Sequence, residues 1–203
     1  MPSMVERPFA ESCVENRAPI LAVLAPRLAR CRSLLEIGSG TGQHAVYFGP
    51  ELGHLRWQTS DRRENHAGIR AWLDEAGLVN VLPPLALDVL RDPWPVEPYD
   101  AVFSANTAHI MAQAAVEAMF AGVGRVLVSG GLFLLYGPFC YGGQHTAPSN
   151  AQFDEWLAAR DPAMGVRDVD WLGELAAAAG MTLAEDIEMP VNNRTLVWRK
   201  ASQ

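Results

Sequence analysis

An apolar run that breaks into three glycines, set two residues apart, is the feature that most constrains the fold of this chain. The run is Leu34 to Ile37, and Gly38, Gly40 and Gly42 follow it. Because glycine lacks a Cβ atom, it can adopt positive φ and lets a bound molecule lie directly against the backbone. The stretch therefore predicts a buried strand, a tight turn that forms a binding surface, and the start of a helix.

The spacing of these glycines separates two classes of ligand. A dinucleotide-binding loop has the pattern G-x-G-x-x-G with a pyrophosphate at the helix N-terminus, but Gln43 stands where its third glycine would be. The acidic Glu36, two residues before the first glycine, suits an ammonium or hydroxyl group better than a phosphate. We therefore expect S-adenosylmethionine, which has an amino-acid end and no phosphate, and we disfavour a nicotinamide-dependent oxidoreductase.

Strand and helix patterns alternate along the rest of the chain. Helices are expected at 11–30, 42–52, 64–76, around 116–123 and at 169–179, and strands at 33–37, 55–60, 79–87, 99–105, 131–136, 181–188 and 194–200. Pro26 predicts a break or kink in the first helix. The alternation indicates an α/β fold, with a doubly wound, mostly parallel seven-stranded sheet and an antiparallel edge hairpin.

The domain organisation follows from length and composition. A chain of 203 residues fits a single domain, and it shows no internal repeat. We expect residues 1–203 to form one domain with an N-terminal helical segment at about 11–30. A segment at about 137–165, rich in glycine, proline and aromatic residues, is long enough to be a functional insertion on the substrate side.

Charge and hydropathy exclude some classes of partner. With 16 basic and 23 acidic residues the net charge is −7, whereas nucleic-acid-binding proteins generally carry a basic face. The most apolar span, Val123 to Phe139, is interrupted by Arg125 and by Gly130-Gly131, so it indicates a helix end and a buried strand rather than a membrane span. We expect neither nucleic acid nor a membrane as a partner.

The cysteines and the first residues bear on the compartment. Met1 to Glu15 is polar and contains proline, without the apolar stretch of a signal peptide. Cys13, Cys31 and Cys140 are an odd number at unrelated spacings, which predicts neither a disulfide framework nor a zinc site. A reducing, cytoplasmic location is therefore expected.

Polar residues follow several of the predicted strands. In an open parallel sheet, ligands lie outside the carboxyl ends of the strands. Asp61 ends the second strand, where a carboxylate can accept hydrogen bonds from both ribose hydroxyls, and Asp88 follows the third, where it could accept from an adenine amino group. The alternative for both acids is a helix cap or a solvated loop. Asn106 and Tyr136 end the fourth and fifth strands.

The pattern Glu36-x-Gly38-x-Gly40-x-Gly42, with acids at the next two strand ends, resembles the class I S-adenosylmethionine-dependent methyltransferase fold. Longer stretches resemble the methyltransferase-like 26 family, also called domain of unknown function 938, across nearly the whole chain. Thr59 departs from the proline expected there. The stretches are Glu15-Asn16-Arg17-x-Pro19-Ile20, Leu35 to Tyr47, Trp57-Gln58-x-Ser60-Asp61, Asn106-x-x-His109-Ile110, Tyr136 to Phe139, Ser149-Asn150-x-x-Phe153-Asp154 and Asn192-Asn193.

The resemblance implies a role for each matching residue on the cofactor side. The loop from Gly38 to Gly42, with Ser39 and Thr41, would face the methionine part and the ribose. Asp61 would bind the ribose hydroxyls, Asp88-Val89 the adenine, and Asn106 would lie beneath the sulfonium. Arg17 is a candidate for the cofactor's carboxylate, because a guanidinium group matches that geometry; a helix-surface charge is its alternative.

The acceptor side is less constrained. Methyl transfer is an in-line displacement that needs alignment, desolvation and, for a protonated acceptor, a base. His109 is the best base, with Asn106 and Tyr136 beside it at strand ends, although a histidine there can equally cap a helix or hydrogen-bond in the core. The residues expected to surround the acceptor, with ordinary loop packing as the alternative, are Phe139, Tyr141, Asn150, Phe153, Asn192 and Asn193, with His145 and Asp154 beside them.

Two functions remain open at this point. The first is a methyltransferase that acts on a small molecule without a metal, since no H-E-x-x-H or C-x-x-C spacing is present. The second is a non-catalytic protein that binds S-adenosylmethionine or S-adenosylhomocysteine in a regulatory or interaction role. A nucleic-acid methyltransferase is disfavoured, because Asn106-Thr107-Ala108-His109 lacks the Asn-Pro-Pro-aromatic signature. The acceptor atom and the oligomeric state stay open.

Overall fold

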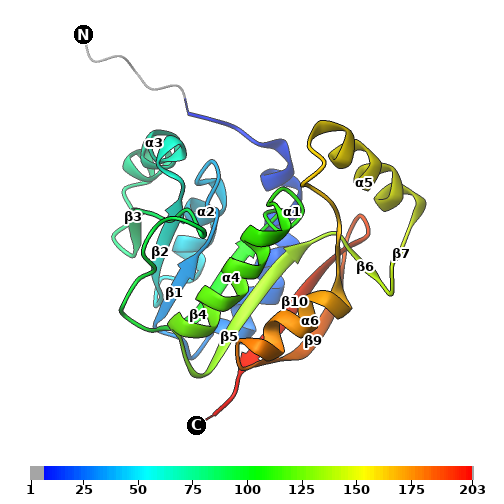
Figure 1. Ribbon diagram of the computed structural model, residues 1–203. Helices are drawn as coiled ribbons and strands as arrows, with labels where there is room; N and C mark the ends of the chain where they lie inside the picture. The colour runs from blue at the N-terminus through cyan, green and yellow to red at the C-terminus, as the bar shows by residue number, and fades with distance from the viewer. Residues whose placement is uncertain (1–6, 203) are drawn as a thin grey trace. The chain divides into compact units, whose positions relative to one another are not determined.

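The computed structural model describes residues 7–202, which form two compact units, 7–93 and 94–202. Residues 1–6 and 203 lie outside the described residues, and so does part of the polar segment Met1–Glu15. The first unit contains three helices, a 3-10 turn and three strands, shown in blue to green in Figure 1. They are α1 (Glu11–Leu28), β1 (Ser33–Glu36), α2 (Gln43–Glu51), β2 (Arg56–Asp61), η1 (Arg63–Asn65), α3 (His66–Ala76) and β3 (Val81–Ala86).

The second unit contains three helices and seven strands. They are β4 (Tyr99–Ala105), α4 (Gln113–Val126), β5 (Leu127–Gly137), β6 (Phe139–Tyr141), β7 (Gln144–His145), α5 (Pro148–Arg160), β8 (Arg167–Asp168), α6 (Val169–Ala178), β9 (Met181–Met189) and β10 (Asn193–Lys200). The seven long strands of the described chain form a mostly parallel sheet in the order β3-β2-β1-β4-β5-β10-β9. β10 is antiparallel to both β5 and β9. The predicted α/β fold with an antiparallel edge hairpin is confirmed.

The first helix differs from the sequence prediction. α1 continues through Pro26 and ends at Leu28, so a break at this proline is wrong, and the alternative of a kink stays a prediction. Pro26 lies in the last turn, and its missing N–H removes one backbone hydrogen bond from the helix. Ile20 and Leu24 are fully buried on the helix, and α1 packs along α2.

β3 lies at the edge of the sheet, and this position explains its two prolines. Pro83 and Pro84 lack the N–H that a central strand needs, but an edge strand tolerates them. The hydroxyl of Thr59 donates to the Leu82 carbonyl at 2.7 Å, and the Gln58 amide donates to Pro83 at 2.7 Å. Thr59, the departure from the family pattern, is therefore an anchor for the edge strand.

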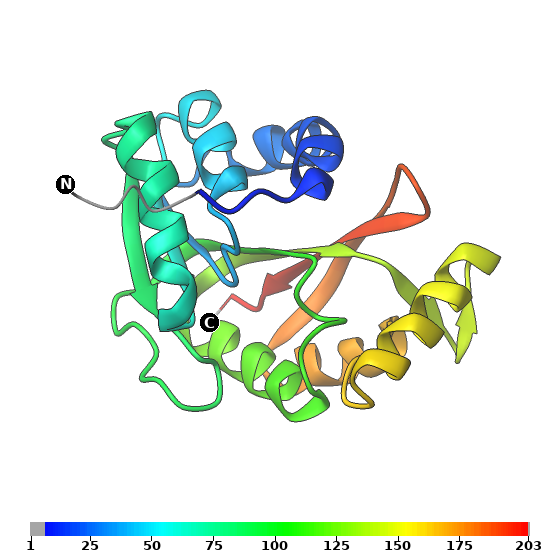
Figure 2. The ribbon, with the colours of Figure 1, turned by 90° about the horizontal axis from the view of Figure 1, so that it is seen from above.

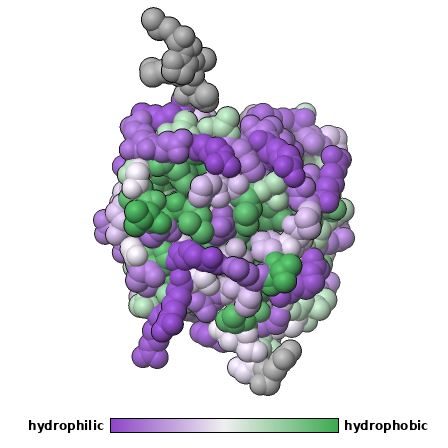
Figure 3. Space-filling view, turned by 90° about the vertical axis from the view of Figure 1, so that its left-hand side faces the viewer, coloured by the Kyte–Doolittle hydropathy of each residue, from purple (hydrophilic) through white to green (hydrophobic). Residues whose placement is uncertain are grey.

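The surface near this edge is partly apolar. Figure 3 shows the face that carries α3 and β3 on the left of Figure 1, where apolar groups lie between hydrophilic ones. Val79 and Leu90, on either side of β3, are 96% and 54% exposed. Single exposed apolar residues of this kind are normal on a protein surface.

The N-terminal segment Arg7–Ala10 lies against α3 before α1 begins. The Trp72 indole N–H donates to the Pro8 carbonyl at 2.7 Å. Arg7 stacks over the Trp72 ring at 4.5 Å and pairs with Glu75 at 2.6 Å. A Cβ atom at Gly68 would lie 2.5 Å from Pro8 Cγ, so α3 accommodates the segment only because residue 68 is glycine.

An aromatic cluster forms the centre of the second unit. The ring centroid of Trp198 lies 5.1 Å from that of Phe120 and 5.5 Å from that of Phe133, and all three side chains are fully buried. β5 begins at Leu127, four residues earlier than predicted. Gly130, inside this strand, has φ of 74°, and the pairing of β5 with β4 shifts register near that point. The glycine pair thus makes an irregularity inside the strand rather than a boundary.

The segment expected as an irregular insertion contains regular structure. Residues 137–165 include the β6–β7 hairpin and helix α5, which lie side by side in both ribbon views (Figures 1 and 2). α5 buries only Asn150 and Leu157. The helix was missed because it has no apolar stripe at helical spacing, which is the signal that identifies a helix in sequence. That the whole chain forms a single domain stays a prediction.

Candidate functional site

The glycine loop between β1 and α2 has the backbone that the sequence predicted. Gly38, Gly40 and Gly42 have φ of 69°, 60° and 90°, the left-handed region that favours glycine. At Gly42 a Cβ atom would also lie 3.2 Å from Ile69 Cα, so α3 requires a glycine there. At Gly40 the nearest heavy atom to a Cβ would be the Gly38 carbonyl at 4.0 Å. The loop is therefore bare backbone with open space beside Gly40.

Asp61, at the end of β2, holds this loop in place. Its Oδ2 atom accepts a hydrogen bond from the Gly40 N–H at 2.7 Å, and its Oδ1 atom accepts from the Arg62 N–H and the Asn65 amide at 2.7 and 2.8 Å. The residue is buried. A carboxylate has about four acceptor positions, so these three bonds leave capacity for a hydroxyl donor. Asp61 thus has a structural role in addition to the predicted contact with ribose.

Glu36, the last residue of β1, lies beneath the loop and is 2% exposed. Its Oε2 atom accepts hydrogen bonds from Ser39 Oγ at 2.9 Å and from the Trp57 indole at 3.0 Å. Burial raises the pKa of the Glu36 carboxyl to about 7, although the two hydrogen bonds oppose that shift. The carboxyl therefore exchanges its proton near neutral pH, and a cation placed beside it would favour the charged form.

Gln43 connects the loop to the N-terminal segment. Its Oε1 atom accepts from the Ala10 N–H at 2.6 Å and from Thr41 Oγ1 at 2.9 Å. The sequence used Gln43 only to exclude a dinucleotide, and nothing in the spacing indicated this bridging role. Thr41 also accepts from the Gln43 N–H at 3.2 Å. The turn into α2 is therefore fixed by side chains rather than by a helix cap of the usual type.

Asp88 follows β3 and makes the local contacts of a turn. Its Oδ1 atom accepts from the Leu90 N–H at 3.0 Å, and its own N–H donates to Asp92 Oδ2 at 2.8 Å. Leu87 donates its N–H to the Asp61 carbonyl at 3.0 Å, which keeps this turn beside the end of β2. Asp88 therefore stabilises the turn, which was the alternative role expected from the sequence. The contact of Asp88 and the adjoining Val89 with adenine stays a prediction.

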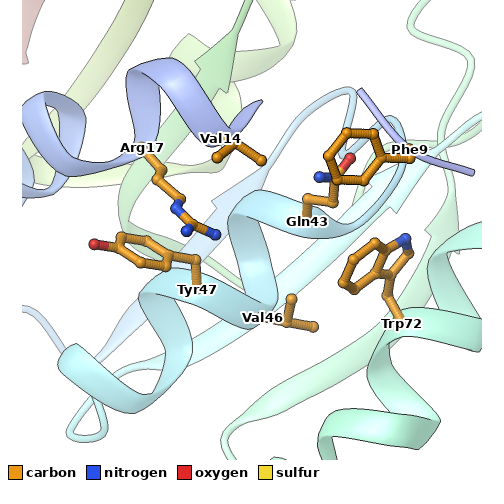
Figure 4. Close-up of a pocket in the computed structure, with 7 residues that line it drawn as sticks. All are labelled: Phe9, Val14, Arg17, Gln43, Val46, Tyr47 and Trp72. Atoms are coloured by element: carbon orange, nitrogen blue, oxygen red, sulfur yellow. The ribbon is translucent and has the colours of Figure 1, made fainter. Parts of the chain in front are cut away.

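Arg17 projects from α1 and stacks over the Tyr47 ring at 4.4 Å. It lines a pocket of about 200 Å³ between α1, α2 and α3, which we call the helical pocket (Figure 4). His44 accompanies Arg17 and bonds through Nε2 to Asn16 Oδ1 at 2.7 Å. Burial, helped by the charge of Arg17, lowers the pKa of His44 to about 4. The pocket is lined by Phe9, Val14, Arg17, Gln43, Val46, Tyr47 and Trp72.

In the second unit, Asn106 ends β4 with an unusual backbone. Its φ is 55°, and its N–H donates to the Tyr136 carbonyl at 2.9 Å. Residues other than glycine seldom adopt this conformation, and asparagine is among those that tolerate it best. The Ser104 and Thr107 hydroxyls, 2.5 Å apart, hold the turn on either side. Asn106 and Tyr136 thus meet at neighbouring strand ends, as the sequence predicted.

His109 lies in the loop after β4 and is 7% exposed. The Phe153 ring meets it edge-on with centroids 5.2 Å apart, and the Gly165 N–H donates to its carbonyl at 2.9 Å. Burial, together with the charge of Arg167, lowers the pKa of His109 to about 4. The imidazole is therefore neutral at pH 7 and can accept a proton, although a pKa of about 4 makes it a weak base.

Arg167 was not identified from the sequence, yet it fixes the loop that carries His109. Its guanidinium donates to the Ala108 carbonyl at 3.1 Å, to the Ala163 carbonyl at 2.8 Å and to the Met111 carbonyl. No motif marks this residue, since it lies at the end of the poorly patterned insertion. Arg167 therefore positions the His109 loop.

Several residues expected around the acceptor bond to one another instead. The Tyr141 hydroxyl donates to Asp186 Oδ2 at 2.6 Å, and Asp186 also pairs with Arg194 at 2.7 Å. The Asn150 amide donates to the Asn192 carbonyl at 3.0 Å. These contacts connect β6 and α5 to the β9–β10 hairpin. We call the four residues that make them, Tyr141, Asp186, Asn150 and Asn192, the hairpin clamp.

The remaining acceptor-side residues are also engaged within the unit. Phe139 is 1% exposed and belongs to the core, and the Asn193 N–H donates to the Pro190 carbonyl at 3.3 Å. His145 Nε2 lies 3.3 Å from Asp154 Oδ2, and Asp154 Oδ1 accepts from the Val166 N–H at 2.7 Å. Phe153 is the member of the set that contacts His109.

Two further observations concern residues 7–202 as a whole. In this part of the chain, no group of three or more His, Cys, Asp or Glu side chains is arranged to hold a metal ion. None of the helices described there has both the length and the apolar character needed to cross a membrane.

The fold is shared with solved methyltransferase structures. An O-methyltransferase family protein from Burkholderia thailandensis superposes with a TM-score of 0.82 at 15% identity, covering 95% of this chain and 58% of that one. Human N-acetylserotonin methyltransferase, solved with S-adenosylmethionine, gives 0.78 at 16% identity, covering 95% and 53%. The chain thus spans little more than half of these proteins, and the likeness is one of fold.

The sequence itself matches one family model over most of its length. The match covers residues 7–200, which include the glycine loop, Asp61, Asn106 and His109. The chain therefore belongs to the family described as "Protein of unknown function (DUF938)".

Proposed function

We propose that this protein is an S-adenosylmethionine-dependent methyltransferase. The observation that carries the proposal is the bare glycine loop, whose Gly40 N–H is fixed by the Asp61 carboxylate at 2.7 Å. The loop offers open backbone beside Gly40 and two carboxyl groups, and no cationic side chain contributes to its hydrogen bonds. Such a set suits hydroxyl and ammonium groups, and it suits a phosphate poorly. Solved methyltransferases with the same fold support the choice.

The residues on this side have distinct tasks in the proposal. Bound S-adenosylmethionine would supply an electrophilic methyl group. Gly38 to Gly42 leave room for its amino-acid end, Glu36 provides the negative charge below the loop, and Asp61 accepts from the ribose hydroxyls. Asp88 and Val89 border the adenine.

The acceptor side is assigned to the second unit. Asn106 contributes to orienting the reacting groups, and its left-handed backbone supports this assignment, because strained conformations concentrate at functional sites. Neutral His109 accepts the proton that a hydroxyl or amine acceptor loses as its new bond to carbon forms. Tyr136 and Phe153 border the same region. In-line transfer of this kind requires no metal.

We also infer the finer points that the resemblance suggested. The chain is a member of the methyltransferase-like 26 group, its acceptor is a small molecule rather than a nucleic acid, and it acts in the cytoplasm. The net charge of −7 and the odd number of cysteines at unrelated spacings support these inferences.

A second function is favoured by the hairpin clamp. Because Tyr141, Asn150 and Asn192 bond to their own unit, they are not poised as acceptor ligands in the structure. A protein that binds S-adenosylmethionine or S-adenosylhomocysteine without catalysis would need no acceptor site. The two functions share the glycine loop and differ only in the second unit.

Calorimetry with S-adenosylmethionine and S-adenosylhomocysteine tests the shared part. We expect binding by the wild type, and Asp61→Asn should weaken it by about 1–3 kcal/mol, the value of a hydrogen bond to a charged group. Asp74→Asn, an exposed acid on α3, removes the same charge and should leave binding unchanged. No binding at millimolar ligand would contradict both functions.

Methyl-labelled cofactor incubated with a small-molecule extract separates the two functions. A methyltransferase yields a labelled product that is lost in His109→Gln and Asn106→Ala and persists in the presence of a chelator. Cofactor binding without any labelled product would favour the non-catalytic function. In a parallel incubation with whole-cell extract, label recovered only in nucleic acid would overturn the small-molecule acceptor.

A further inference from the structure

The helical pocket between α1, α2 and α3 differs in character from the glycine loop. It has a cationic end, where Arg17 stacks over Tyr47, and an apolar end, where Phe9 and Trp72 lie (Figure 4). Val14 and Val46 form the walls between the two ends (Figure 4). A pocket with one cationic group and an apolar body selects ligands that combine an anionic group with an apolar body.

The cationic end offers a free edge of one guanidinium group. Among the described residues no carboxylate pairs with Arg17, whose flat face lies on the Tyr47 ring at 4.4 Å. Stacking uses the face of the guanidinium and leaves its N–H edge for a planar anion, which a carboxylate matches with two parallel hydrogen bonds. His44 is neutral at pH 7 and adds no charge here. A dianionic phosphate usually recruits several cationic groups, and Arg17 is the one cationic side chain among the residues that line this pocket.

The apolar end is preorganised. The Trp72 ring is fixed by its hydrogen bond to the Pro8 carbonyl and by Arg7 stacked on it at 4.5 Å. Phe9 beside it is 66% exposed, so its ring is accessible to a ligand. Aromatic side chains held in this way present a surface for another ring at little further entropy cost.

The volume of the pocket matches a ligand with about one ring. Its volume is about 200 Å³, and an apolar cavity of about 150 Å³ is known to hold benzene. We propose that the helical pocket is a binding site for a small aromatic carboxylate, with the carboxylate on Arg17 and the ring against Trp72. This site is separate from the cofactor loop, and the proposal does not depend on the proposed function.

Gln43 gives the site a route to the glycine loop. Its side chain lines the pocket, and its Oε1 atom receives hydrogen bonds from both Ala10 and Thr41. A ligand that contacts Gln43 therefore acts on the residue that fixes the turn into α2. By thermodynamic linkage, any effect of this ligand on cofactor affinity is matched by an equal effect of the cofactor on the ligand.

The test uses benzoate as the probe, with the full-length protein and two-dimensional NMR of the indole N–H groups. The Trp72 signal is assigned from its loss in Trp72→Phe. We expect benzoate to shift this signal saturably, whereas acetate, which lacks the ring, and benzyl alcohol, which lacks the charge, should bind at least about tenfold more weakly. Phenyl phosphate tests which anion the pocket prefers. If it binds more tightly than benzoate, the proposal that the ligand is a carboxylate is wrong.

Variants locate the site. Arg17→Gln should weaken benzoate by about tenfold or more, because it removes a charge-assisted pair of hydrogen bonds. Arg70→Gln, an exposed arginine on α3 with the same change of charge, should leave benzoate affinity within about twofold. Val46→Trp, which fills the pocket from α2, should abolish binding while circular dichroism remains that of the wild type. Unchanged benzoate affinity in either Arg17→Gln or Val46→Trp would overturn the site.

The result also separates this site from the cofactor role that the resemblance gave to Arg17. If Arg17→Gln weakens S-adenosylmethionine and benzoate does not bind at about 10 mM, then Arg17 serves the cofactor's carboxylate and the proposal is wrong. If the variant loses benzoate and keeps its affinity for S-adenosylmethionine, the helical pocket is a distinct site whether or not the protein is an enzyme.

Discussion

The glycine loop of the first unit and the hairpin clamp of the second unit treat their polar groups in different ways. In the loop, Asp61 and Glu36 hold backbone and side-chain donors while open space remains beside Gly40. In the clamp, Tyr141, Asn150 and Asn192 bond to partners in their own unit. The first arrangement keeps acceptor capacity for a ligand, and the second uses it for stability. Whether a polar residue near a strand end binds a ligand or anchors the fold can therefore be decided only from its hydrogen-bond partners.

The largest expected effect separates two glycines of the same loop. Gly42→Ala adds a Cβ atom 3.2 Å from Ile69 Cα at φ of 90°, which should lower the free energy of unfolding by about 2–4 kcal/mol through strain and overpacking. Gly40→Ala meets no atom closer than 4.0 Å and should cost only about 1 kcal/mol while weakening cofactor binding strongly. Chemical denaturation and calorimetry measure the two effects. Equal stability losses would show that the loop is packing alone.

The next effect concerns pH and Glu36. An acid whose folded pKa lies above its unfolded value stabilises the fold fully at low pH, and this contribution is lost as pH rises through the folded pKa. With values of 4.5 and about 7, the free energy of unfolding should fall by about 3 kcal/mol between pH 5 and pH 8. Glu36→Gln should remove this part of the slope. If Glu36→Gln keeps the pH dependence of the wild type's free energy of unfolding, a group other than Glu36 titrates in this range.

A smaller effect tests the clamp through Asn150. Asn150→Ala removes hydrogen bonds to Thr146 Oγ1 and to the Asn192 carbonyl, which should cost about 1–3 kcal/mol because the carbonyl loses its donor. Activity per folded molecule should stay within about twofold if the residue is an anchor, since its kcat and KM then depend on the remaining site. A raised KM at unchanged stability would show that Asn150 binds the acceptor, and the contrast between the glycine loop and the hairpin clamp would then be wrong.

The smallest effect is expected for Tyr141. Tyr141→Phe deletes the hydroxyl that donates to Asp186, a carboxylate that keeps its pair with Arg194. The loss should be about 1 kcal/mol of stability, measured by thermal unfolding. The double variant with Asn150→Ala shows whether the two anchors act together, since independent sites add and coupled ones do not.

The sequence predicted most of the fold because its elements carry local signals. β4 was expected at 99–105 and is found at Tyr99–Ala105, and the helix stop at Gly77 has the left-handed φ of 61° that a glycine permits. Helix α5 was missed because tertiary contacts rather than an apolar stripe hold it. Pro26 predicted a break that the structure does not have, because the sequence pattern does not show how strongly packing holds α1.

The candidate site was predictable to the extent that backbone geometry determines it. The positive φ values at Gly38, Gly40 and Gly42 follow from residue type alone. The partners of Asp61 and the raised pKa of Glu36 depend on burial and on β2, which the spacing of the motif does not contain. Arg167 could not be found at all, because its three acceptors are backbone carbonyls, and these carry no residue signature.

Gly68 has a consequence for anyone who wishes to make this protein more stable. Replacing a helical glycine by alanine is a standard stabilising step, worth about 1 kcal/mol of helix propensity. Here the added methyl group would lie 2.5 Å from Pro8 Cγ and would lift the N-terminal segment from α3. A propensity-based redesign would therefore strengthen one helix while releasing the segment that reaches Gln43, and through it the turn into α2.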